Sequence, residues 1–112
     1  MFDFIGIDEV EERIYEYIQV LNERATTIVT EDYQVEYGRK FAKIFAYNNG
    51  KKSCIHAFVN LNNGDVIKPA TYKAPQKNAD GTFAVRFNLI DDESRELMYS
   101  VVDFAGSYLY KR

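Results

Sequence analysis

The chain has 112 residues, a mass of 13.0 kDa and a formal net charge of −3, enough for one packed domain and too little for two. Its 46 % hydrophobic and 28 % charged residues are typical of a folded globular protein and exclude a disordered chain. No apolar run reaches the roughly 18 residues that a membrane helix needs.

One cysteine and one histidine cannot form an internal disulfide or the usual four-ligand zinc site, so we expect no metal and no cofactor. The first residues, Met-Phe-Asp-Phe, lack the basic region of a signal peptide. We therefore expect a cytoplasmic protein that does not enter a membrane.

The first predicted element is an amphipathic helix over about residues 8–24. Asp8 and Glu11 form a capping-box-like start, and further glutamates follow on the solvent side. The apolar positions recur at steps of three and four residues: Ile7, Val10, Ile14, Tyr17, Ile18 and Leu21.

The middle of the chain changes to a period of two residues, which is typical of half-buried strands. Asn-Gly or Asp-Gly pairs, which favour the positive φ of hairpin turns, occur at Gly50, Gly64 and Gly81. Pro69 has no backbone N–H, so its strand is expected at a sheet edge or a bulge. The predicted strands are residues 37–47, 52–61, 65–73 and 82–89, with residues 27–35 as a candidate edge strand.

A second helix is predicted over about residues 92–110, with Asp91 or Asp92 as its N-cap. Its apolar face is expected to contain Leu97, Met98, Val101, Val102, Ala105, Tyr108 and Leu109. The fold class is therefore α+β. We expect one domain over residues 1–112, with an antiparallel meander of four to five strands (about residues 27–89) flanked by an N-terminal and a C-terminal helix.

Charge is distributed unevenly along the chain. Residues 1–36 hold ten acidic and two basic side chains, whereas residues 37–89 hold nine basic and two acidic ones. Such segregation favours an anionic partner for the basic half. The alternative is that the acidic helices neutralise a basic sheet beneath them.

The predicted first hairpin defines a candidate binding surface. Small side chains at Ala42, Ile44 and Ala46 favour a helix-covered face, paired with Ile55, Ala57 and Val59 of the next strand. The opposite face would then combine aromatic rings with cations, as single-stranded nucleic acid requires. The candidate nucleic-acid-binding residues are Arg39, Phe41, Lys43, Phe45, His56, Phe58, Lys68, Tyr72, Lys73 and Arg86. Alternatively, these rings are buried under the C-terminal helix or in a homodimer.

The segment around Tyr72 is a second part of this candidate surface. Lys68, Lys73 and Lys77 flank Pro69 and Pro75, which stiffen the backbone. A rigid basic loop beside an aromatic sheet face could hold a phosphate-bearing ligand. A solvated connecting loop explains the same residues equally simply.

Catalysis is not predicted. Cys54 and His56 alternate onto one side of a strand, but same-face neighbours lie about 6–7 Å apart, too far for a nucleophile and its base. The sequence also has no phosphate-binding glycine loop and no Gly-x-Ser-x-Gly motif. We therefore expect no enzyme and no catalytic residue.

One stretch of the chain has a specific order of residues: His56-Ala57-Phe58-Val59, then Gly64-Asp65-Val66-Ile67-Lys68-Pro69-Ala70, then Thr71-Tyr72-Lys73-Ala74-Pro75. This order resembles a motif of small uncharacterised proteins of tailed bacteriophages and covers about residues 37–77. Those proteins commonly have tryptophan at the position of Tyr72, followed by a more basic segment than residues 76–80 here. The resemblance implies a phage origin and a location in the host cytoplasm, and it supplies no activity.

Two functions are consistent with these patterns. The first is a non-enzymatic phage-type accessory protein that binds nucleic acid, preferably single-stranded, through a basic aromatic sheet face. The alternative is a protein-interaction module that inhibits a host enzyme or defence system, in one version by binding a signalling nucleotide.

Overall fold

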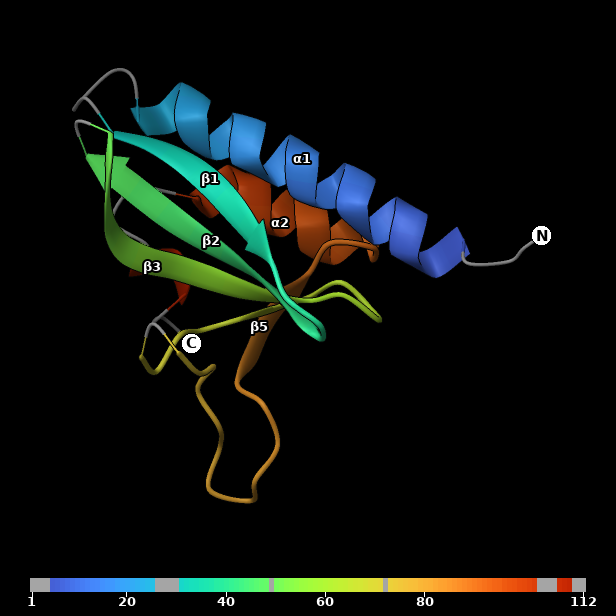
Figure 1. The fold of residues 1–112 in the computed structure, drawn as a ribbon. Helices are drawn as coiled ribbons and strands as arrows, with labels where there is room; N and C mark the ends of the chain where they lie inside the picture. The colour runs from blue at the N-terminus through green and yellow to red at the C-terminus, as the bar shows by residue number, and fades with distance from the viewer. Residues whose placement is uncertain (1–4, 26–30, 49, 72, 103–106, 110–112) are drawn as a thin grey trace.

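The computed structural model describes residues 5–25, 31–48, 50–71, 73–102 and 107–109. Helix α1 (Ile5–Ala25) precedes five strands: β1 (Glu31–Tyr37), β2 (Phe41–Asn48), β3 (Lys51–Asn60), β4 (Asp65–Ile67) and β5 (Val85–Asn88). Helix α2 (Asp92–Val101) and the short 3-10 helix η1 (Ser107–Leu109) follow. The strands form one antiparallel sheet in the order β1-β2-β3-β4-β5, with α1 and α2 beside each other against it (Figure 1). The predicted α+β fold is confirmed.

Several predicted boundaries are wrong. Residues 37–47 are not one strand, because the N–H of Gly38 donates to the carbonyl of Phe41 and closes a hairpin turn between β1 and β2. β4 ends at Ile67 instead of residue 73, and Pro69 makes only an isolated bridge to Pro75. β4 is not an edge strand, since it lies between β3 and β5, but the alternative expectation of a bulge is met in its pairing with β5, between Val66 and Ile67. Helix α2 ends at residue 101, and residues 103–106 and 110 of the predicted helix lie outside the described part.

The core lies between the helices and one face of the sheet. Val10, Ile14, Tyr17 and Leu21 of α1 are fully or almost fully buried, as their spacing predicts. They pack in one cluster with small sheet residues such as Ala42, which allow the helix axis to come close to the strands. Burying each large apolar side chain contributes about 1.5–3 kcal/mol, so this stripe holds α1 in place.

Helix α2 buries a narrower stripe than the sequence predicts. Met98 and Val102 are buried, whereas Leu97 and Val101 are 60 % and 46 % exposed. Neighbouring residues of a helix point about 100° apart, so a short helix can direct only one of the two pairs into the core. The assignment of Leu97 and Val101 to the buried face is therefore wrong.

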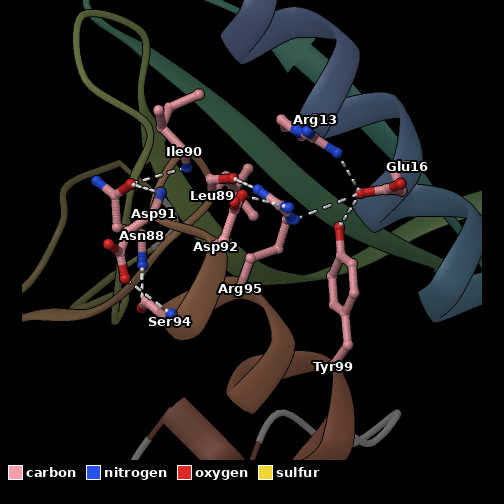
Figure 2. Close-up of polar contacts among 10 residues, drawn as sticks. All are labelled: Arg13, Glu16, Asn88, Leu89, Ile90, Asp91, Asp92, Ser94, Arg95 and Tyr99. Carbon is pink, nitrogen blue, oxygen red and sulfur yellow. Dashed lines mark hydrogen bonds and ion pairs between the residues drawn. The ribbon is translucent and has the colours of Figure 1, made fainter.

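The start of α2 is fixed to the end of β5 by side-chain hydrogen bonds. Asp91 is the N-cap, and its Oδ2 accepts from the N–H of Ser94 at 2.9 Å (Figure 2). The side-chain oxygen of Asn88 accepts from the N–H groups of Ile90 and Asp91, both at 2.8 Å. These bonds satisfy donors at the turn that would otherwise lose hydrogen bonds to water.

Glu16 of α1 connects the two helices. Its Oε1 accepts from the hydroxyl of Tyr99 at 3.1 Å and lies 3.9 Å from Nε of Arg95, both in α2 (Figure 2). Arg13 approaches the same oxygen at 3.3 Å. Both helices are thereby held on the same face of the sheet.

The turn before β4 requires glycine for two reasons. Gly64 has a φ of +81°, and a Cβ at this position would lie 2.8 Å from Cγ1 of Ile90. Gly50 has a similar φ of +80°, but a Cβ there would meet nothing within 4 Å. The two glycines therefore differ in crowding and not in backbone conformation.

We expect Gly50→Ala to lower the free energy of unfolding by about 1–2 kcal/mol because of the left-handed backbone alone. Gly64→Ala should lower it by a further 1–3 kcal/mol or so because of the contact with Ile90. Urea denaturation of both variants measures the difference. An equal loss of unfolding free energy in Gly50→Ala and Gly64→Ala would contradict the close packing of Gly64 against Ile90.

Candidate nucleic-acid interface

The pairing of β2 with β3 determines which side chains face the helices. Ala42 lies opposite Val59, and Ile44 lies opposite Ala57, as predicted. The next pair is Phe45 with Ile55, so β3 has one extra residue at this point, and Ala46 lies opposite Cys54 instead of the predicted Ile55. Such a β-bulge disturbs the simple alternation of faces.

His56 is the extra residue, and it lies in the core instead of on the opposite face. Its side chain is 5 % exposed. Its ring contacts that of Tyr33 edge to face at 5.1 Å, and its Nε2 lies 2.7 Å from the hydroxyl of Tyr108. The prediction that His56 shares a surface with Phe41 is therefore wrong, and the bulge is the reason.

The Tyr108 hydroxyl also hydrogen-bonds to the hydroxyl of Tyr17 at 2.5 Å. A buried chain of polar groups thus joins α1, η1 and β3. Burial raises the pKa of the Tyr17 phenol strongly, and the bond from Tyr108 offsets only part of this effect. Tyr17 therefore stays neutral in the folded protein well above its ordinary pKa of 10.0.

This pKa predicts alkaline instability. Because the pKa of Tyr17 is higher in the folded than in the unfolded chain, its contribution is complete below pH 10 and declines above it, by up to about 1.4 kcal/mol per pH unit. The free energy of unfolding measured from pH 9 to 12 should fall less steeply in Tyr17→Phe. Tyr15→Phe is the control, since Tyr15 is 66 % exposed, and it should keep the wild-type slope.

The face away from the helices carries a group of rings that we call the phenylalanine cluster: Phe41, Phe58 and Phe83. The ring of Phe41 packs edge to face on Phe58 at 6.0 Å and on Phe83 at 5.3 Å. Nζ of Lys43 lies 5.9 Å from the centre of the Phe58 ring, and Nζ of Lys77 lies 5.5 Å from that of Phe83. Both ends of the cluster thus carry an ammonium group in cation–π contact.

Two predicted stacking residues are not accessible. Phe58 is 1 % exposed and Phe45 is 3 % exposed. The Lys52 ammonium lies over the Phe45 ring at 4.3 Å and pairs with Glu36 of β1 at 2.5 Å. Because neighbouring side chains cover both rings, the expected platform of open rings at Phe45 and Phe58 is wrong.

The other predicted residues are dispersed. Arg39 is exposed in the β1–β2 turn, Lys73 is exposed, and Lys68 is half-buried. The segment that contains these two lysines extends away from the sheet (Figure 1, yellow to orange). Tyr72 lies outside the described residues.

Arg86 is not part of this surface. Val66 pairs with Phe87 and Ile67 with Val85, which leaves Arg86 as the extra residue of a bulge between β4 and β5. Its Nε donates to the carbonyl of Leu109 in η1 at 2.8 Å. Arg86 therefore fixes η1 to the sheet, and the prediction that it lies near Phe41 is wrong.

The sequence analysis missed Phe83 as a member of the site, and it placed Lys77 in the basic loop around Tyr72 instead of beside this ring. Phe83 was assigned to a strand over residues 82–89, but β5 begins only at Val85. An isolated antiparallel bridge pairs Lys77 with Phe83 instead. Asp80 was the available signal, because Lys77 and Phe83 are each three residues away from it, and residues at equal distance on either side of a hairpin turn lie opposite each other.

The cysteine and the histidine of the chain do not lie on one surface. Cys54 is exposed, whereas His56 is buried against Tyr33 and Tyr108. Within the described ranges, no three histidine, cysteine, aspartate or glutamate side chains gather as metal ligands would. In the same ranges, no helix combines the length and the apolar character needed to cross a lipid bilayer.

Fold and site define a small α+β protein in which the sheet face away from α1 and α2 carries a ring cluster between two lysines. The chain belongs to DUF7717, a family of unknown function, whose model matches residues 5–111. No curated protein and no solved structure matches the chain. Family membership therefore covers the whole fold and assigns no activity to it.

The burial of Phe58 predicts that its removal destabilises the fold. Phe58→Ala should lower the free energy of unfolding by about 3–5 kcal/mol, because it leaves a cavity between the sheet and its neighbours. Phe83→Ala should lower the free energy of unfolding by less than Phe58→Ala, since Phe83 is only half-buried. Urea denaturation compares the two, and an unchanged stability of Phe58→Ala would mean that this ring is open to solvent.

Proposed function

We propose that the protein is a non-enzymatic nucleic-acid-binding protein and that the phenylalanine cluster is its contact surface. One observation carries the proposal: Lys43 and Lys77 lie at the two ends of a row of three rings on the face that no described helix covers. Ammonium groups beside aromatic rings supply the two contacts that single strands need, one to phosphate and one to bases.

The roles within the cluster differ with burial. Phe41 and Phe83 are half-buried, so part of each ring is available for stacking on a base. Phe58 is buried and supports Phe41 from within the sheet face. The proposed surface is thus smaller than the sequence predicted, with two stacking rings.

The surrounding charge favours an anionic ligand. Exposed Arg39 and Lys40 lie in the turn next to Phe41, and Lys73 is exposed on the segment that carries Phe83. The two acidic residues between positions 37 and 89 are engaged locally: Asp65 accepts from Asn88 and Asp80 from Thr82. Lysine and arginine side chains in such a region attract phosphates by releasing bound counterions.

The test is fluorescence anisotropy of a labelled oligothymidine at several salt concentrations. We expect binding that weakens as salt rises, and Lys77→Gln should reduce the slope of log K against log salt by about 0.7, the value for one phosphate contact to a single strand. Lys51→Gln is the matched control, because Lys51 is also exposed but is the first residue of β3, at the opposite end of the β2–β3 hairpin from Phe41. Its slope should equal that of the wild type.

Two results would contradict the proposal. The first is no retention of the oligonucleotide at low salt. The second is an equal loss of binding in Lys77→Gln and Lys51→Gln, which would indicate a diffuse attraction to positive charge without a site.

A second candidate function is protein binding through α2, with a host enzyme or defence factor as the partner under the phage resemblance. The supporting observation is the pair of exposed apolar residues Leu97 and Val101 on a helix that also exposes Asp92, Glu93 and Glu96. An apolar centre within an acidic rim fits a basic protein surface. A partner captured in stoichiometric amount by the wild type and lost in Leu97→Asp would favour this function over the first.

A further inference from the structure

Strand β1 is an edge of the sheet, and its hydrogen bonds show which of its backbone groups face outward. The bond from Gly38 N–H to the Phe41 carbonyl identifies a hydrogen-bonded pair. Bonded and non-bonded pairs alternate along an antiparallel ladder, so Glu36 and Gln34 bond to β2. The N–H and C=O groups of Tyr33, Val35 and Tyr37 therefore point away from the sheet.

Asn22 of α1 occupies the first of these outward positions. Its Oδ1 accepts from the N–H of Tyr33 at 2.7 Å, and its Nδ2 donates to the carbonyl of Tyr33 at 3.4 Å. These are the two bonds that a residue of an added strand would make. The edge at Tyr33 thus already holds an amide in the position of a neighbouring strand.

The remaining outward groups, those of Val35 and Tyr37, have no such cover. In the described part of the chain, no side chain or turn hydrogen-bonds to the backbone of either residue. The side chain of Tyr37 itself is 51 % exposed. A row of unpaired backbone groups is a template for an added strand.

The negative charge beside this edge favours a partner segment with positive charge. Asp32 is exposed on β1 and Glu11 is exposed on α1, whereas Glu36 of β1 already pairs with Lys52. Burial and then the carboxylate of Glu11 raise the pKa of the Tyr37 hydroxyl, so this carboxylate acts electrostatically on that hydroxyl. A second copy of β1 would bring the same carboxylates to the seam, whereas a basic segment would neutralise them.

We propose that the β1 edge at Val35 and Tyr37 binds an extended, lysine- or arginine-rich segment of a partner protein as an additional strand. Main-chain hydrogen bonds to Val35 and Tyr37 hold the segment, and its cations meet Asp32 and Glu11. Asn22 limits the length of the added strand by closing the edge at Tyr33. The proposal goes beyond nucleic-acid binding, because it uses the acidic side of the molecule.

The experiment follows amide hydrogen exchange of the full chain by NMR, with a short acetylated peptide of alternating lysine and valine as the probe. Without peptide, the amides of Val35 and Tyr37 should exchange fast, while those of Tyr33, Gln34 and Glu36 should be protected. Peptide should slow exchange at Val35 and Tyr37. A peptide of alternating glutamate and valine should have no effect there.

Substitutions distinguish the contribution of the backbone N–H to peptide binding from that of the side chain. Val35→Pro removes the outward N–H and should weaken peptide binding about threefold to tenfold, the effect of one lost hydrogen bond. Val35→Ala keeps the N–H and should bind like the wild type. Tyr37→Pro and Tyr37→Ala form an independent pair at an exposed position, so the test does not depend on the folding of Val35→Pro.

Three outcomes would overturn the proposal: no protection of Val35 and Tyr37 by the lysine peptide, equal affinity of the proline and alanine variants, or protection that depends on protein concentration without peptide. The last would identify a second copy as the occupant. Lys77→Gln should leave peptide binding unchanged, and oligothymidine should not displace the peptide. A failure of either proposed site is thus distinguishable from a failure of the other.

Discussion

The structure depends on the contact of α1 with the small side chains on one face of the central hairpin. Ala42 and Ile44 of β2 pair with Val59 and Ala57 of β3, and all four are buried beneath the helices. Side chains alternate between the two faces of a strand, so this contact directs Phe41 and Lys43 to the opposite face. The ring cluster and the charge around it are therefore consequences of how the core is packed.

The sequence predicted those features that depend on local periodicity. The α1 stripe through Ile14 and Tyr17, the turn at Gly64 and the pairing of Ala42 with Val59 all have the predicted places, because each follows from a repeat of side chains within a few residues. The bulge at His56 could not be predicted in this way. It is stabilised by Tyr108, which is 52 residues away in the sequence.

Alternation predicts the face of a residue but not its exposure. Phe45 lies on the predicted side of β2, yet Lys52 of β3 covers it, and this lysine is held by Glu36 of the neighbouring strand. Phe58 is covered in the same way by Phe41 and Lys43. The candidate site could thus be located on the correct face from sequence, whereas the choice of accessible rings needed contacts between three separate segments.

The hydrogen bond between Tyr17 and Tyr108 spans 91 residues of sequence and has a consequence for biosynthesis. Tyr108 and Leu109 are part of the same buried cluster as α1 and the sheet. While the ribosome still encloses these two residues in its exit tunnel, the helix and strands that have already emerged lack the packing contacts that Tyr108 and Leu109 make with them. The domain therefore closes only after these two residues have left the tunnel, and the nascent chain exposes apolar surface to chaperones until η1 docks.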